Sequence, residues 1–218
     1  MRPAIVIPAL NEAATIASVV RGVAPYGQVV VVDDGSTDAT GTLAAGAGAV
    51  VVSHAAPTGY DGALRAGFAE AAARGHDVLV SFDADAQFDP ADLRRVLEPI
   101  ARGEARLVLG VRPSMARWSE WLFGLYTRWR FGVPDILCGV KAVAADVYER
   151  HKAASAGASI NTGLALAALR AGTRFALVPL AVKPRAGRPR FGGAWRANAR
   201  IFAAFLRALR RDLAPGAG

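Results

Sequence analysis

The sequence predicts an α/β domain with a mostly parallel central sheet and helices on both of its faces. Short apolar runs recur through the first 110 residues, and segments with helical spacing separate them. The runs are apolar throughout and do not alternate with polar residues, which is typical of parallel strands buried on both faces. The chain has 218 residues, of which 53% are hydrophobic, so it can bury one sizeable core. This composition excludes a disordered or collagen-like protein.

Each element of the first half has its own local signal. The strands are the apolar runs at residues 4–8, 29–32, 49–52, 78–82 and 107–110. The helices between them are expected at residues 11–22, 39–45, 59–74 and 89–101. Ser36 or Asp38 can cap the second helix, and Pro90 suits the first turn of the fourth. Strands that are separated by helices in this way predict parallel pairing.

The second half is less regular. Its expected elements are an aromatic and basic segment at 115–132, a small-residue helix at 159–172, a strand at 175–182, a Gly/Pro/Arg loop at 183–193 and a last helix at 194–213. The prediction is therefore a single domain over residues 1–182, followed over residues 183–218 by a basic loop and an amphipathic C-terminal helix.

The net charge of +8 is carried by the end of the chain. Residues 1–182 hold 17 basic and 17 acidic side chains, whereas residues 183–218 hold 9 basic and 1 acidic. A balanced body with a cationic tail indicates one segment that meets phosphate, nucleic acid or lipid headgroups. A nucleic-acid-binding protein would explain residues 183–211 but not the balanced body, so no nucleic-acid partner is expected.

Cysteine and histidine are too sparse to build a site. Cys138 is the single cysteine, and His54, His76 and His151 are scattered and expected to be solvated. This excludes a disulfide framework within the chain and a zinc cluster. The N-terminus has no signal-peptide pattern, and polar residues interrupt every uncharged run, so we expect a cytoplasmic protein without a membrane span.

Two pairs of aspartates follow strands of the predicted sheet. Asp33 and Asp34 stand at the end of the second strand, and Asp83 and Asp85 at the end of the fourth. Ligands bind at the carboxyl edge of open parallel sheets. Two carboxylate pairs at one edge would repel each other without a cation between them, and oxygen ligands suit Mg²⁺ or Mn²⁺ bound with substrate phosphates. The alternative for either pair alone is ordinary turn and cap chemistry.

Three motifs stand at these strand ends, at residues 5–12 (IVIPALNE), 31–38 (VVDDGSTD) and 83–87 (DADAQ). Together they resemble the opening signatures of the inverting family 2 glycosyltransferases, which have the Rossmann-like GT-A fold. Within that family the likeness is to the dolichol- or polyprenyl-phosphate sugar synthases. The resemblance is strong over residues 4–112. Looser likenesses follow at residues 110–112 (GVR), 135–141 (DILCGVK) and 178–190.

The resemblance implies transfer of a sugar from a nucleotide-diphosphate sugar with the help of Mg²⁺ or Mn²⁺. The residues that it implies for binding the nucleotide are Pro8, Ala9, Asn11, Glu12, Asp34 and Asp83, with Asp34 on the base. The implied metal ligands are Asp83, Asp85 and Gln87. The implied catalytic residues are Asp83, Asp85, Arg112 and Asp135. The metal would neutralise charge on the departing nucleoside diphosphate.

A polyprenyl phosphate is the acceptor that the resemblance implies, and as an ionised group it needs no general base. The arginines implied to bind its phosphate are Arg112, Arg117, Arg185 and Arg190. A hydroxyl of a sugar or natural product is the alternative acceptor, and it would need a base such as Asp135. A non-catalytic nucleotide-binding module is a more distant alternative, which the intact Asp83 and Asp85 argue against.

This sequence departs from the family pattern mainly on the acceptor side. Residues 59–64 lack the lysine that is often found there, Cys138 stands in place of a serine, and Pro189 and Arg190 stand where Ser-Lys is common.

Two segments suit a membrane surface. Trp118, Trp121 and Trp129 stand among arginines in the aromatic segment, and the last helix can place arginines on one side and apolar residues on the other. Ordinary packing of both helices on the domain is the alternative. With the lipid acceptor, this pattern predicts peripheral attachment to an anionic membrane on its cytoplasmic face.

Overall fold

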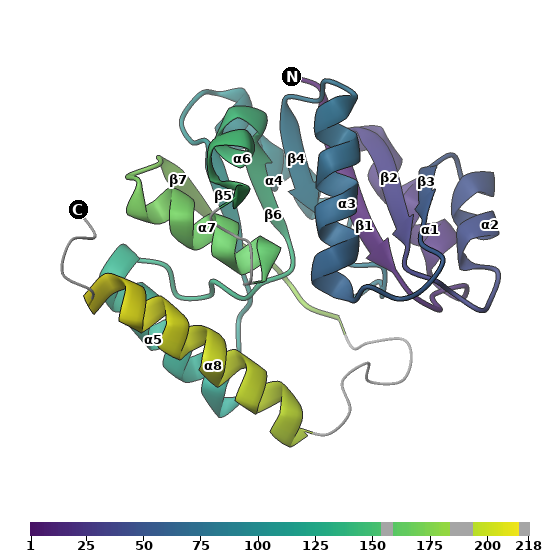
Figure 1. Ribbon diagram of the computed structural model, residues 1–218. Helices are drawn as coiled ribbons and strands as arrows, with labels where there is room; N and C mark the ends of the chain where they lie inside the picture. Colours follow the sequence, from purple (N-terminus) through teal and green to yellow (C-terminus); the bar gives the residue numbers. More distant parts are fainter. Residues whose placement is uncertain (154–158, 184–193, 214–218) are drawn as a thin grey trace.

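The computed structural model describes residues 1–153, 159–183 and 194–213. Its strands are β1 (Pro3–Ala9), β2 (Gln28–Asp33), β3 (Val50–Ser53), β4 (Val78–Ser81), β5 (Leu107–Val111), β6 (Lys141–Ala144) and β7 (Phe175–Pro179). They form one sheet in the order β3-β2-β1-β4-β6-β5-β7 (Figure 1). The predicted fold class is confirmed: the sheet is mostly parallel, and all six expected apolar runs are strands in it.

β6 is the strand that the sequence did not predict. It runs antiparallel to both of its neighbours, β4 and β5, so the sheet is mixed. The strand is four residues long and begins with a lysine, and it passes directly into a helix at Ala145. A short segment without an apolar start or a turn at its end has little of the pattern by which strands are recognised.

The helices agree with the predicted segments except for α6, which the sequence did not predict, and for differences at their starts. They are α1 (Ile16–Val23), α2 (Thr40–Gly46), α3 (Tyr60–Ala73), α4 (Asp92–Ala101), α5 (Trp118–Phe131), α6 (Ala145–His151), α7 (Ile160–Arg170) and α8 (Ala194–Leu213), with a short 3₁₀ turn at Ala24–Tyr26. The start expected at residue 11 is wrong because Asn11 has a positive φ of 52°. The start expected at Asp89 is wrong because its carboxylate accepts a hydrogen bond from Ala91 N in a turn before α4. The expected last strand ends at Pro179 instead of residue 182.

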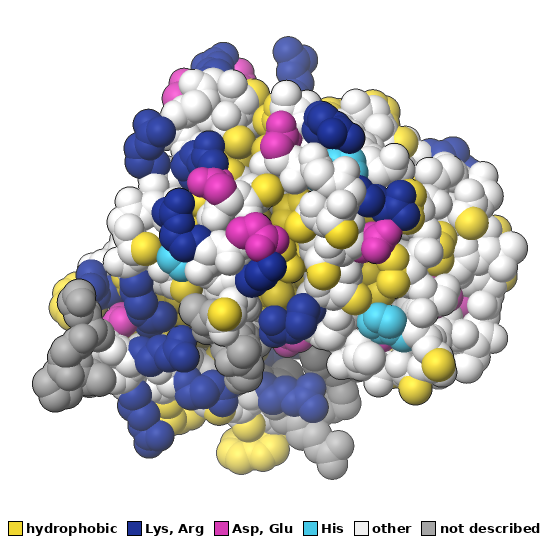
Figure 2. Space-filling view, turned by 45° about the horizontal axis from the view of Figure 1, so that its top comes forward, with side chains coloured by type: hydrophobic (Ala, Val, Ile, Leu, Met, Phe, Trp, Pro, Cys, Tyr) yellow, Lys and Arg dark blue, Asp and Glu magenta, His cyan; other side chains and the backbone are white. Residues whose placement is uncertain are grey.

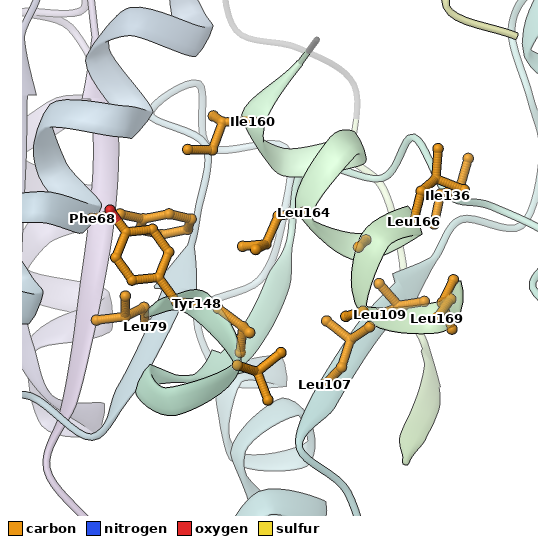
Figure 3. Close-up of a cluster of buried hydrophobic side chains, with 14 of the residues drawn as sticks. Phe68, Leu79, Leu107, Leu109, Ile136, Tyr148, Ile160, Leu164, Leu166 and Leu169 are labelled. Atoms are coloured by element: carbon orange, nitrogen blue, oxygen red, sulfur yellow. The ribbon is translucent and has the colours of Figure 1, made fainter. Parts of the chain in front are cut away.

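Two apolar cores lie on the two faces of the sheet. Ile5 and Ile7 of β1 face a core with α1, α2 and α4, whereas Ala4 and Val6 face a core with α3, α6 and α7. Figure 3 shows the second core, in which the Phe68 and Tyr148 rings meet edge to face at a centroid distance of 5.7 Å beside Leu79 and Leu164. Each such buried large side chain contributes about 2 kcal/mol through burial. These cores hold the strand ends in place.

The helices α5 and α8 lie side by side below the sheet in Figure 1, and their buried residues join the core of α3, α6 and α7. The rings of Phe123 and Tyr126 on α5 pack on Phe205 of α8 at centroid distances of 5.9 and 5.7 Å. Arg170 Nε donates to Asp212 Oδ1 at 2.5 Å, and the Tyr126 hydroxyl also donates to Asp212. Burial and the Asp212 contact raise the pKa of Tyr126 to about 12. These contacts attach α8 to α5 and to α7.

Candidate active site

The carboxyl ends of β1, β2 and β4 bring the predicted motifs to one edge of the sheet. Pro8 and Ala9 are buried at the end of β1, where Ala9 lies opposite Asp33 of β2. β4 pairs with the other side of β1, and Asp83 follows it by two residues. The two aspartate pairs therefore flank the end of β1.

The turn after β1 is held by the turn after β2. Asn11 Oδ1 accepts a hydrogen bond from Thr37 N at 2.8 Å, and Asn11 N donates to Ser36 Oγ at 3.0 Å. Glu12 N donates to Thr40 Oγ1 at 2.8 Å. The positive φ of Asn11 lets the backbone reverse here, which is a conformation that Asn tolerates better than most residues. The two motifs thus form one rigid rim at the sheet edge.

Asp34 is buried beneath the segment that leads into α3, with 3% of its surface exposed. Its Oδ1 accepts from Thr58 N at 2.8 Å and lies 2.7 Å from His54 Nδ1, and its Oδ2 accepts from Gly59 N at 2.7 Å. Burial alone would raise the pKa of Asp34, but the hydrogen bonds from His54, Thr58 and Gly59 hold it below its ordinary value. The expectation that His54 is simply solvated is wrong. The contact of Asp34 with a base stays a prediction, because both of its carboxylate oxygens accept hydrogen bonds from neighbouring residues of the protein.

The second aspartate pair lies on a tight turn after β4. Asp85 is buried and its Oδ1 accepts from Gln87 N at 3.2 Å, while Ala86 between them has a φ of 58°. A Cβ atom on Gly139 would lie 2.2 Å from Asp83 Oδ2, so a larger residue here would push this carboxylate out of its position. The Tyr60 hydroxyl lies 3.4 Å from the other Asp83 oxygen.

The oxygen atoms of this turn suit a hard divalent cation. Asp83, Asp85 and the amide oxygen of Gln87 are ligands of the kind that Mg²⁺ and Mn²⁺ prefer. Across residues 1–153, 159–183 and 194–213, no three or more His, Cys, Asp or Glu side chains gather as a complete metal cage. Two carboxylates fit a cation that takes its other ligands from a diphosphate, as Mg²⁺ commonly does.

Residues that the sequence did not single out hold Gly139 against Asp83. Ser81 Oγ and Asn161 Nδ2 both donate to Gly139 O, at 2.6 and 2.9 Å, and Lys141 Nζ donates to Cys138 O at 2.5 Å. Burial lowers the pKa of Lys141 to about 8 and raises the pKa of the Cys138 thiol to about 12. The available signals were a lysine at the start of a short apolar segment and an asparagine in a small-residue helix, and neither indicates a buried network.

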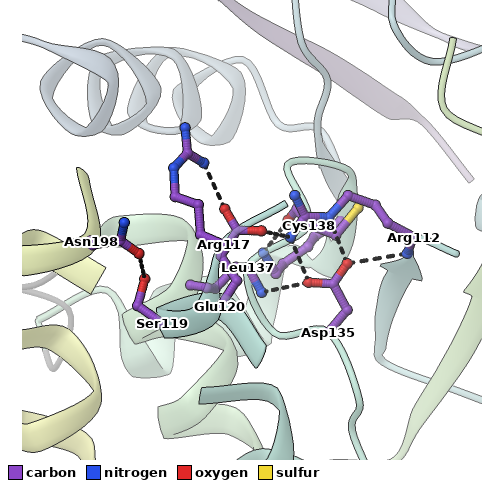
Figure 4. Close-up of polar contacts among 9 residues, drawn as sticks. Arg112, Arg117, Ser119, Glu120, Asp135, Leu137, Cys138 and Asn198 are labelled. Atoms are coloured by element: carbon purple, nitrogen blue, oxygen red, sulfur yellow. Dashed lines mark hydrogen bonds and ion pairs between the residues drawn. The ribbon is translucent and has the colours of Figure 1, made fainter. Parts of the chain in front are cut away.

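The predicted acceptor residues Arg112 and Arg117 lie in a cluster with two buried carboxylates (Figure 4). Arg112 donates from Nε and Nη2 to the two oxygens of Asp135, at 2.8 and 3.0 Å. Arg117 Nη1 donates to Glu120 Oε1 at 2.7 Å. Burial alone would raise the pKa of Asp135, but Arg112 holds it below its ordinary value. Arg185 and Arg190 lie outside the described residues.

Known proteins resemble this chain in sequence over most of its length. The model of glycosyl transferase family 2 matches residues 4–131. The undecaprenyl-phosphate mannosyltransferase of Micrococcus luteus is 32% identical over 203 residues, which cover 83% of this chain and 83% of that protein. The polyprenol monophosphomannose synthase of Mycolicibacterium smegmatis is 34% identical over 170 residues, which cover 68% of this chain and 64% of that protein.

Solved structures resemble the fold. Glucosyl-3-phosphoglycerate synthase from Mycobacterium tuberculosis in complex with phosphoglyceric acid has a TM-score of 0.75 at 26% identity, covering 95% of this chain and 79% of that chain. The same enzyme in complex with Mn²⁺, uridine-diphosphate-glucose and phosphoglyceric acid has a TM-score of 0.73 at 26% identity, covering 96% and 78%. Because the family model runs from β1 through α5 and includes both aspartate pairs, the chain belongs to glycosyl transferase family 2 and is a hexosyltransferase of GT-A fold.

Proposed function

We propose that this enzyme transfers a sugar, with inversion, from a nucleotide-diphosphate sugar to a polyprenyl phosphate at an anionic membrane surface. The observation that carries the proposal is the pair of carboxylates, Asp83 and Asp85, on a tight turn at the edge of the sheet beside Gly139. The similarity to two enzymes named for polyprenyl-phosphate mannose chemistry supports the acceptor. A structural neighbour with Mn²⁺ and uridine-diphosphate-glucose supports the donor class.

The donor side consists of the turns at residues 11–13, 34–40 and 83–87 and the segment at 54–59. In the proposal, the rim formed by Asn11 and Ser36 receives the base and ribose, and Asp83, Asp85 and Gln87 hold Mg²⁺ or Mn²⁺. The bound metal supplies positive charge that offsets the charge developing on the leaving diphosphate. Since backbone hydrogen bonds fix the turns beforehand, little ordering is left for the moment of transfer.

The acceptor side consists of Arg112, Arg117, Glu120 and Asp135. An ionised phosphate oxygen attacks the sugar from the face opposite the leaving group, and guanidinium groups fix its orientation by two-pronged hydrogen bonds. A hydroxyl acceptor would require Asp135 as its base. The lowered pKa of Asp135 and its pairing with Arg112 make this carboxylate a weak base, which favours the phosphate acceptor.

An exposed aromatic stripe on α5 supports the membrane surface. Trp118, Trp121, Leu125 and Trp129 recur at helical spacing, and each is more than half exposed, with Trp129 at 79%. Figure 2 shows basic side chains over much of this face, its lower part included. Aromatic rings beside arginines suit the headgroup region of a bilayer. No helix in the described part of the chain is both long and apolar enough to cross a membrane.

The test is a screen of nucleotide sugars with Mg²⁺ or Mn²⁺ and a short polyprenyl phosphate. Release of nucleoside diphosphate should require the metal and the lipid phosphate together, and the product should be a glycosyl phosphate of inverted anomeric configuration. Transfer to a sugar hydroxyl with no response to lipid phosphate would refute the proposed acceptor. Transfer that survives chelation would refute the metal.

A further inference from the structure

Glu120 is a buried carboxylate with an unsatisfied oxygen at the acceptor side. The residue lies in the first turn of α5 and is 4% exposed. Its Oε1 accepts from Arg117, whereas its Oε2 lies 3.5 Å from Arg112 Nη2 and has no hydrogen-bond partner. Leaving a buried carboxylate oxygen in this state costs free energy. Such a group is therefore a candidate for a role in binding.

The partners of Glu120 differ from those of Asp135. Both oxygens of Asp135 accept hydrogen bonds from Arg112, so that pair is complete. Glu120 engages Arg117 at 2.7 Å and only approaches Arg112. The two carboxylates offset the charges of the two guanidinium groups, and the buried Lys141 near Asp135 adds one further positive charge. An acceptor phosphate can reach the guanidinium edges that face the two carboxylates by taking the place of one of them.

We infer that Glu120 occupies the acceptor's phosphate position on Arg117 and Arg112 in the free protein, and that acceptor binding displaces it. The inference rests on the proposed function. Ser119 Oγ donates to Asn198 Oδ1 at 2.6 Å, which ties this turn of α5 to α8, so the exchange is a rotation of the Glu120 side chain (Figure 4). A phosphate monoester carries more charge and more acceptor oxygens than a carboxylate. Glu120 thereby selects phosphate over weaker anions.

The experiment compares the wild type with Glu120→Gln. The control is Glu98→Gln, which removes a glutamate of α4 from an exposed ion pair with Arg102. A short polyprenyl phosphate is titrated against each protein by calorimetry without donor, and then in the transfer reaction. Glu120→Gln should tighten acceptor binding about tenfold, the equivalent of one charge-assisted hydrogen bond released to the ligand. The KM for the donor should stay within about twofold, and Glu98→Gln should change neither.

A second comparison separates displacement from a structural role. In an Arg117→Gln background the gain from Glu120→Gln should largely disappear, because the arginine that it frees is absent. If Glu120→Gln does not fold, Glu120→Asp keeps the charge and withdraws the carboxylate by one methylene group, and it should give a smaller gain in the same direction. Unchanged or weaker acceptor binding by a folded variant overturns the inference, as does a loss of kcat with an unchanged KM for the acceptor.

The proposed function and this inference fail in different ways. If the wild type transfers sugar to a hydroxyl and never to polyprenyl phosphate, the proposed acceptor is wrong. Binding of inorganic phosphate then decides the role of Glu120, since it should tighten in Glu120→Gln if the carboxylate occupies a phosphate position. If the wild type uses polyprenyl phosphate and Glu120→Gln binds it no better, only the inference is wrong.

Discussion

The proposed donor side and the proposed acceptor side of this enzyme are built from different kinds of contact. On the donor side, backbone N–H groups of Thr58 and Gly59 bind Asp34, and short turns bind one another. On the acceptor side, the guanidinium groups of Arg112 and Arg117 pair with carboxylates on separate elements. Backbone donors lie where the chain path puts them, whereas charged side chains can exchange partners. We therefore expect a rigid donor side and an acceptor side that changes its pairing when it binds.

The largest effect is expected from removing a proposed metal ligand on the donor side. Asp85→Asn removes one carboxylate charge and keeps the shape of the turn, so transfer should fall by about a thousandfold or more while the unfolding midpoint stays close to that of the wild type. Chelation should have the same effect on the wild type. Asp77→Asn, an exposed aspartate before the start of the same strand, is the control and should stay active. Transfer within a few-fold of the wild type would exclude metal binding by Asp85.

A smaller effect is expected at Asp34. Asp34→Ala leaves the N–H groups of Thr58 and Gly59 without their acceptor, which should cost about 2–4 kcal/mol of unfolding free energy and weaken binding of the nucleoside diphosphate. Denaturant titration and calorimetry measure the two effects. If stability falls and nucleotide affinity does not, Asp34 supports the loop and does not contact the base.

Low pH should remove the stability that the charged Asp34 contributes to the wild type. The pKa of Asp34 is lowered from 3.8, so its stabilising contribution is complete above pH 3.8 and is lost as the pH falls through the lowered value. Denaturant midpoints measured from pH 6 down to about pH 2 should fall more steeply in the wild type than in Asp34→Ala. Equal slopes would mean that the hydrogen bonds of Asp34 do not favour its charged form.

The smallest effect per residue is expected on α8. Arg200, Arg207 and Arg210 are exposed, and replacing them with Gln should weaken binding to anionic vesicles by about 1 kcal/mol per charge removed. Added salt should weaken wild-type binding in the same way. Sedimentation with vesicles that contain phosphatidylserine measures both. Binding that responds neither to salt nor to these substitutions would leave the aromatic stripe and α8 without the proposed membrane role.

The strand ends that carry the proposed donor side could be predicted from sequence because their signals are local. Each pair of aspartates directly follows an apolar run, so its place at a strand end could be predicted. The turn at Asn11 was expected to be helical instead, because its partners Ser36 and Thr37 are distant in the chain. The partners of Asp34 and Gly139 are distant in the chain, and the pairing of Asp34 with His54 links residues that no periodic pattern connects. Glu120 could not be predicted as a site residue. Glutamate is common in the first turn of a helix, where it interacts favourably with the helix dipole.

The fold shows the same division between local and distant signals. Apolar runs predict the parallel strands, which are buried on both faces. β6 has no such run, and its pairing partners β4 and β5 lie far away in the sequence. β6 is buried because it pairs with β4 and β5, so its burial exists only in the folded sheet.

The reversed direction of β6 has a consequence for how such an enzyme can diversify. An antiparallel strand begins at the edge where its parallel neighbours end, so the segment before Lys141 reaches the reaction edge from the opposite direction to the donor motifs. Insertions between α5 and β6 would therefore lengthen the wall around the proposed acceptor site while every βα turn on the proposed nucleotide side kept its length. New acceptors can in this way be acquired without rebuilding the machinery that handles the activated sugar.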